Sequence, residues 1–122
     1  MNDEDKEFLE SLRKDFIEEA SDLLLKCEES LLNYEKNFEE SYFQEYMRVL
    51  HSMKGSSRAV EFDSFASTIH QIESLGQKSK DQQFVEKSLN SIDGLKASLD
   101  MIRNENTDES ENILKGILEK LK

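Results

Sequence analysis

The sequence predicts an all-α protein, an antiparallel up-and-down four-helix bundle with an additional C-terminal fifth helix. Apolar residues recur every three or four positions along most of the chain, as they do on one face of a helix. The 122 residues include no proline and only four glycines, too few turn residues for a β-rich fold. An apolar content of 36% is enough for one helical core, so we expect a single domain over residues 1–122.

The first two predicted helices cover residues 3–36 and 41–60. The second begins at a candidate capping box, Ser41-x-x-Gln44. Cys27 lies on the apolar stripe of the first helix, which predicts a small core residue rather than a reactive thiol. The stripe of the first helix contains Leu9, Leu12, Phe16, Ala20, Leu23, Cys27, Leu31 and Tyr34.

Three further helices are predicted over residues 63–79, 82–104 and 108–121. Asp63 or Ser64 is the expected N-cap of the third helix, and Asp81 that of the fourth. The segments between the helices are short, so successive helices should run antiparallel.

The charge and the apolar pattern exclude several classes of partner. A net charge of −11 argues against nucleic acid and anionic lipid. No apolar run approaches the ~20 residues that cross a bilayer, and no signal peptide is visible. A single cysteine rules out an internal disulfide and is compatible with a reducing compartment. We therefore expect a soluble, cytoplasmic protein.

One stripe of the second helix carries the groups best suited to chemistry. His51, Lys54, Gly55 and Arg58 stand at positions i, i+3, i+4 and i+7 of a helix. A glycine inside a helix costs about 1 kcal/mol relative to alanine, which suggests close approach by another molecule. A neutral imidazole is a competent nucleophile toward phosphorus, and two cations could hold phosphoryl oxygens. Ser56 adds only a small side chain next to this stripe.

These residues resemble the H-x-x-K-G signature of histidine-containing phosphotransfer (HPt) domains. His70 and Glu73 follow on the third helix, as in the N-terminal phosphotransfer domain of chemotaxis histidine kinases, to which the chain is similar. The resemblance implies that His51 is phosphorylated on Nε2 and that Glu73 accepts a hydrogen bond from its Nδ1. Lys54 and His70 would complete the polar network around that pair.

The resemblance also implies a function. The chain would be a phosphorelay intermediate that takes a phosphoryl group from a histidine kinase or a receiver domain and passes it to an aspartate of a response-regulator receiver. No Gly-rich phosphate loop is visible, so the ATP-binding domain of a kinase, in cis or in trans, would supply the group. The chain could thus be the phosphoacceptor part of a histidine kinase. It would need no cofactor of its own, because the partner would provide Mg²⁺.

Two alternatives remain at this stage. The domain could be a degenerate HPt module that acts as a helical scaffold without phosphotransfer. A zinc site built from His51, His70 and Glu73, with or without Cys27, is disfavoured because Lys54 would oppose a cation and no paired-ligand spacing is present. We therefore expect no metal site.

One position departs from the HPt pattern. The family usually has a glycine ten residues after the histidine, and here that position is Glu61, followed by Phe62. If the backbone is left-handed there, a glutamate should be strained. Arg58 also stands where some relatives have a small residue, and could be a local addition to phosphate binding.

Overall fold

The computed structural model describes residues 2–122, which form five α-helices and no strand. All five predicted helices are present, and each end differs from its predicted position by one residue at most. The helices are α1 (Asp3–Asn37), α2 (Glu40–Ala59), α3 (Asp63–Lys78), α4 (Gln82–Arg103) and α5 (Thr107–Leu121).

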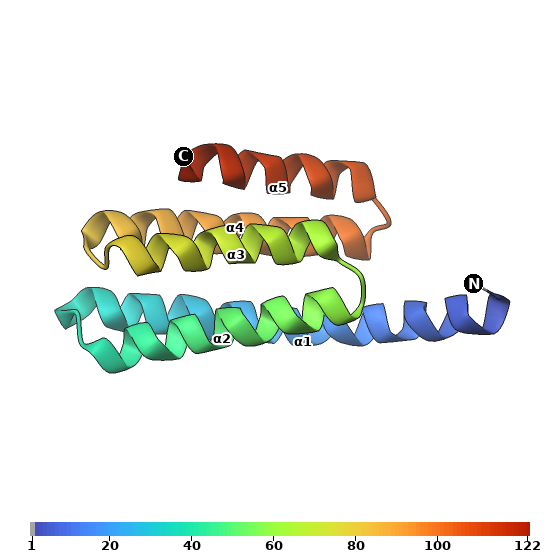
Figure 1. Cartoon of the computed structure of the whole chain (residues 1–122), viewed down its shortest axis with the longest axis horizontal. Coiled ribbons are helices and arrows are strands. Elements are labelled where there is room, and N and C mark those ends of the chain that lie inside the picture. The colour runs from blue at the N-terminus through green and yellow to red at the C-terminus, as the bar shows by residue number, and fades with distance from the viewer. Residues whose placement is uncertain (1) are drawn as a thin grey trace.

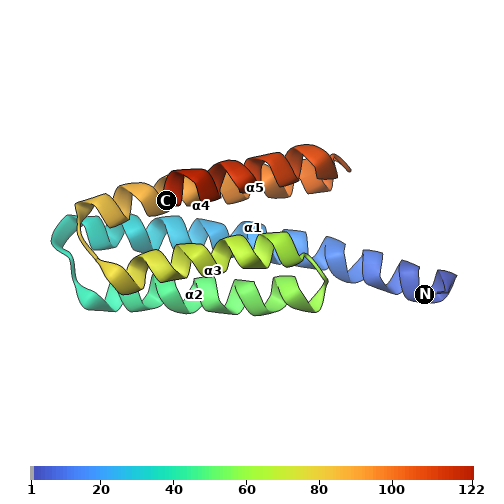
Figure 2. The ribbon, with the colours of Figure 1, turned by 45° about the horizontal axis from the view of Figure 1, so that its top comes forward.

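The helices run alternately up and down, side by side (Figure 1). α1 packs against α2 and α4, and α3 packs against α2, α4 and α5. α5 lies mainly along α4, and the N-terminal part of α1 projects past the ends of the other helices (Figures 1 and 2). This arrangement is compatible with the predicted bundle of four helices and a fifth helix outside it.

The core is built from the apolar stripes, with a correction in α1. Leu24, not Leu23, is fully buried. The buried face of α1 continues from Ala20 to the residue four positions on, which is Leu24, and then reaches Cys27. Leu12 was expected in the core, yet it is 37% exposed, because α1 extends there beyond its partners. Leu9, also expected in the core, is only partly buried.

Cys27 is fully buried, in agreement with the prediction that it is a core residue. Burial, together with the negative charge of Glu45, raises the pKa of the Cys27 thiol from 9.0 to about 12. The thiol is therefore neutral and is shielded from solvent in the folded protein.

Only one of the predicted N-caps is correct. The Asp81 carboxylate accepts a hydrogen bond from the backbone N–H of Phe84 at 3.0 Å, as expected for the start of α4. The capping box at Ser41 is wrong, because α2 begins one residue earlier and Gln44 instead donates to the Glu40 carboxylate at 2.9 Å. A residue that already lies within the first turn cannot cap it.

The N-cap predicted for α3 is also wrong. Phe62 occupies that position, Asp63 is already helical, and no side chain caps the helix. The Phe62 ring packs against Phe16, with the centroids 5.6 Å apart, and beneath the Arg13 guanidinium at 4.8 Å. Ring packing therefore orients the start of α3, and the sequence pattern carries no sign of this contact with α1.

The corner between α2 and α3 contains the residue that departs from the family pattern. Glu61 has a φ of 64°, in the left-handed region. Its N–H donates to the carbonyl of Arg58 at 3.0 Å, and that of Phe62 donates to the carbonyl of Ser57 at 2.8 Å. These two bonds form a Schellman motif, which normally has glycine at the left-handed position. The backbone at Glu61 is therefore left-handed, which is the condition under which the sequence analysis expected a glutamate to be strained.

Within the described part of the chain, no helix combines the length and the apolar character needed to span a membrane.

Candidate functional site

The candidate nucleophile lies on the outer surface of α2, on the side that faces α3. The side chain of His51 is 74% exposed. Its neighbours Leu50 and Met53 are completely buried, so the turn of helix that carries the imidazole is anchored in the core. The site thus combines a fixed backbone with an accessible ring.

Glu73 of α3 reaches this histidine from the side. Its Oε2 atom lies 3.4 Å from Nδ1 of His51. That distance is longer than the about 2.7–3.2 Å of an ordinary N–H···O hydrogen bond. The carboxylate nevertheless stands against Nδ1, so Nε2 is the ring nitrogen that faces away from it.

The same carboxylate also holds Lys54. Its Oε1 atom lies 2.7 Å from Nζ of Lys54, although the angles are not those of an aligned hydrogen bond. Only 12% of the Lys54 side chain and 11% of the Glu73 side chain are exposed. The sequence predicted Lys54 as a residue of the polar network around His51, and the structure adds that this lysine is paired with Glu73. Because both charges are poorly solvated, each depends on the other for stabilisation. An unpaired buried charge would destabilise the folded protein.

His70 does not join this cluster. Its residue is exposed on α3, one turn before Glu73. Throughout residues 2–122, no hydrogen bond or ion pair links its side chain to His51, Lys54 or Glu73. The structure therefore brings together three of the four residues predicted for the polar network.

The surface beside His51 is open and basic. Gly55 is exposed, and a Cβ atom built on it would meet nothing within 4 Å. Arg58 is exposed and forms no ion pair with any described residue, whereas Ser56 is half-buried. The glycine is therefore not required by packing within the domain, although it weakens the helix.

Sequence reasoning missed Arg13, which ties α1 to the end of α2. Its Nε donates to the carbonyl of Val60 at 2.9 Å. This bond and the contact of its guanidinium with Phe62 hold the corner that follows the histidine-bearing helix. A lone arginine on a charged helix gives no signal of such a role.

No group of three or more His, Cys, Asp and Glu side chains that could hold a metal ion occurs in residues 2–122.

Comparison with known protein families decides the identity. Residues 11–105 match the model of the Hpt domain. The chain belongs to the Hpt domain family. No solved structure matches it. The matched range runs from within α1 to just past α4, so α5 lies outside it. Membership of the Hpt family assigns the chain a phosphotransfer role in two-component signalling.

Proposed function

We propose that this Hpt domain is a phosphorelay intermediate whose phosphoacceptor is His51. The observation that carries the proposal is the arrangement of one exposed imidazole against one buried carboxylate. Glu73 faces Nδ1 across 3.4 Å and thereby favours the tautomer with the proton on Nδ1. Nε2 then keeps its lone pair and points toward solvent, where a partner can reach it.

Transfer to His51 exchanges one bond for another. The Nε2 lone pair attacks phosphorus, and the bond between phosphorus and the donor's oxygen breaks, leaving the electron pair on that oxygen. The ring becomes cationic while Nδ1 keeps its proton, and the Glu73 carboxylate stabilises the developing positive charge. In the onward step an aspartate oxygen attacks phosphorus, and the electron pair of the P–N bond returns to Nε2.

Two cations on the same helix face suit a phosphoryl group at this position. Lys54 lies one turn from His51 and is already held at the site by Glu73. Arg58 lies one turn further, exposed and without an ion pair to a described residue. Both can offer charge-assisted hydrogen bonds to phosphoryl oxygens. We assign Lys54 the main share, because its position is fixed before the group arrives.

The partners follow from the same chemistry. The domain would take its phosphoryl group from the ATP-binding domain of a histidine kinase, in cis or in trans, or from a receiver, and pass it to a receiver aspartate in the cytoplasm. The partner would supply Mg²⁺. We further propose that α1 to α4 act as an antiparallel four-helix bundle of the chemotaxis-kinase type. The basic stripe of α2 on a chain of net charge −11 would steer an acidic receiver pocket toward His51.

The test compares two histidine variants of the intact chain. The parent, His51→Gln and His70→Gln are incubated with a phosphorylated receiver and, separately, with a histidine kinase ATP-binding domain and ATP. The parent and His70→Gln should acquire an acid-labile, base-stable phosphate, and His51→Gln should not. Both variants change an exposed imidazole to the same amide, so a general effect of the substitution appears in both. Equal labelling of His51→Gln and the parent would rule out His51 as the acceptor.

A further inference from the structure

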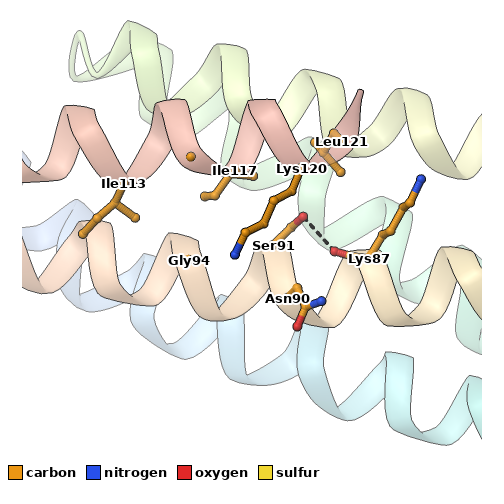
Figure 3. Close-up of a pocket in the computed structure, with 9 residues that line it drawn as sticks. Lys87, Asn90, Ser91, Gly94, Ile113, Ile117, Lys120 and Leu121 are labelled. Carbon is orange, nitrogen blue, oxygen red and sulfur yellow. Dashed lines mark hydrogen bonds between the residues drawn. The ribbon is translucent and has the colours of Figure 1, made fainter.

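A groove between α4 and α5 has no part in the proposed phosphotransfer. It has a volume of about 450 Å³. Ile113, Ile117 and Leu121 of α5 form its apolar side. Lys87 of α4 stands at the end near Leu121, and the Lys120 side chain of α5 extends toward Gly94 (Figure 3). No acidic residue lines it, although the chain as a whole has a net charge of −11. The groove is thus an apolar and basic surface on an acidic protein.

The groove is formed by close packing of the two helices. A Cβ atom at Gly94 of α4 would lie 2.7 Å from the side chain of Ile117, so α5 approaches α4 closely at this point. Gly116, by contrast, faces open space, where a Cβ atom would meet nothing within 4 Å. Ser91 donates its hydroxyl proton to the carbonyl of Lys87 at 2.8 Å (Figure 3). The groove is therefore closed at its base, where Gly94 meets Ile117, and open to solvent beside Gly116.

A second unpartnered feature lies at the opposite end of the molecule. No side chain of residues 3–12 of α1 is buried, and the N-terminal part of this segment projects beyond the bundle (Figure 1). Phe8 is 67% exposed and Leu12 is 37% exposed, one turn apart on the same face. The first turn of this segment is acidic, with Asp3, Glu4 and Asp5. We call residues 3–12 the projecting segment.

The projecting segment and the groove match in charge, polarity and length. Along the segment, the three acidic residues of the first turn precede the exposed Phe8 and Leu12. Along the groove, Lys87 and Lys120 lie on the Leu121 side of Ile113 (Figure 3). The seven-residue step from Asp5 to Leu12 spans about 11 Å of helix, and the step from Lys120 to Ile113 spans the same length. An acidic first turn placed at the Lys87 end therefore brings Phe8 and Leu12 along the part of the groove that Ile117 and Ile113 line.

We propose that the projecting segment of one copy of this chain docks into the α4–α5 groove of a second copy. The segment and the groove lie on opposite sides of the bundle, with α1 on one side and α5 on the other (Figure 1), so the contact is head-to-tail and propagates rather than closing a symmetric pair. One short helix in one groove is a small contact, so the association is weak, with a Kd on the order of 0.1–1 mM. His51 belongs to neither surface, so it stays accessible in the assembly.

The first experiment measures self-association of the intact chain by sedimentation equilibrium at physiological salt. The average mass should rise above 14.2 kDa as the concentration approaches the millimolar range. Lys87→Glu/Lys120→Glu should weaken association by about tenfold or more, because it places like charges together. Phe8→Ala should weaken it by about tenfold, because the ring loses its buried position. A chain that remains monomeric at about 1 mM, the upper end of the expected Kd range, would overturn the proposal. The groove would then serve another partner.

Matched controls separate docking from general charge effects. Lys115→Glu changes the charge of α5 by the same amount as Lys120→Glu, at an exposed position that does not line the groove. Leu25→Ala removes an exposed apolar side chain of α1 outside the projecting segment. Neither control should alter association. Equal weakening by Lys115→Glu and Lys120→Glu would refute docking in this groove.

A charge exchange gives the most specific test. Lys87→Glu/Lys120→Glu has an acidic groove, and Glu4→Lys/Asp5→Lys has a basic projecting segment. Each variant alone should stay monomeric, and a mixture of the two should associate because the signs are then complementary. Amide NMR shifts upon mixing should fall on α4, α5 and the projecting segment. A mixture that does not associate, or shifts confined to the surface around His51, would contradict the proposal. Because His51→Gln should associate like the parent, failure here leaves the phosphotransfer proposal untouched.

Discussion

The ion pair between Lys54 and Glu73 yields the sharpest prediction for the site. Glu73→Gln keeps the size of the side chain and removes its charge. The Lys54 ammonium is then left without an oppositely charged partner. Removing one partner of a buried ion pair costs about 3–5 kcal/mol. Here 12% of the Lys54 side chain remains exposed, so some water still reaches the ammonium. We therefore expect Glu73→Gln to lower the free energy of unfolding by about 2–3 kcal/mol.

A double-mutant cycle tests this magnitude. Lys54→Met should cost about 2–3 kcal/mol for the same reason, because it strands the carboxylate. The combination Lys54→Met/Glu73→Gln leaves no unpaired charge, so its cost should be far below the sum, with a coupling energy of about 2 kcal/mol. Urea titrations followed by far-ultraviolet circular dichroism give each free energy. A coupling energy below about 0.5 kcal/mol would show that the two side chains do not depend on each other.

The same variant separates the catalytic and structural roles of Glu73. If the carboxylate orients His51, Glu73→Gln should slow phosphorylation at least about tenfold under conditions where the protein stays folded. The rate is measured at a temperature well below the melting transition of the variant. A rate that falls only in proportion to the folded fraction would make Glu73 a structural residue alone.

Three further predictions concern other parts of the chain. Gly55→Ala should stabilise the protein by about 1 kcal/mol, because the added methyl group meets open space, yet slow transfer from a partner that approaches there. Glu61→Gly should raise the free energy of unfolding by about 0.5–1 kcal/mol, because it relieves a left-handed non-glycine residue at the expense of a more flexible unfolded chain. Cys27 should resist alkylation in the native state at about pH 8, below its ordinary pKa of 9.0. Since folding raises the pKa of this thiol from 9.0 to about 12, its contribution to stability is complete below pH 9 and declines as the pH rises toward 12.

The controls for these predictions are direct. Thermal melts of Gly55→Ala should be paired with its transfer rate, since unchanged transfer would mean that no partner approaches that glycine. A lower melting temperature for Glu61→Gly would show that the glutamate side chain stabilises the corner. Alkylation of Cys27 should follow global unfolding as urea is added. Rapid alkylation without urea would contradict its burial.

Much of the fold was predictable because it depends on local patterns. The 3.6-residue period of apolar side chains located all five helices to within one residue at each end, and the absence of proline and of loop glycines excluded other classes. Asp81 was recognisable as a cap because its bond to Phe84 spans only three residues. The H-x-x-K-G spacing likewise placed His51, Lys54 and Gly55 on one face of α2.

What the sequence could not supply were contacts between distant segments. The start of α3 depends on packing of Phe62 against α1, which overrode the local preference for a capping Asp63. Which side chains of α1 are buried, Leu24 rather than Leu23, with Leu12 left exposed, depends on which part of its face meets the partner helices. Glu73 was known only by analogy to lie near His51, and only the pairing of α2 with α3 set its two contacts and left His70 outside them. Local spacing therefore determined which residues share a helix face, and tertiary packing decided which faces meet.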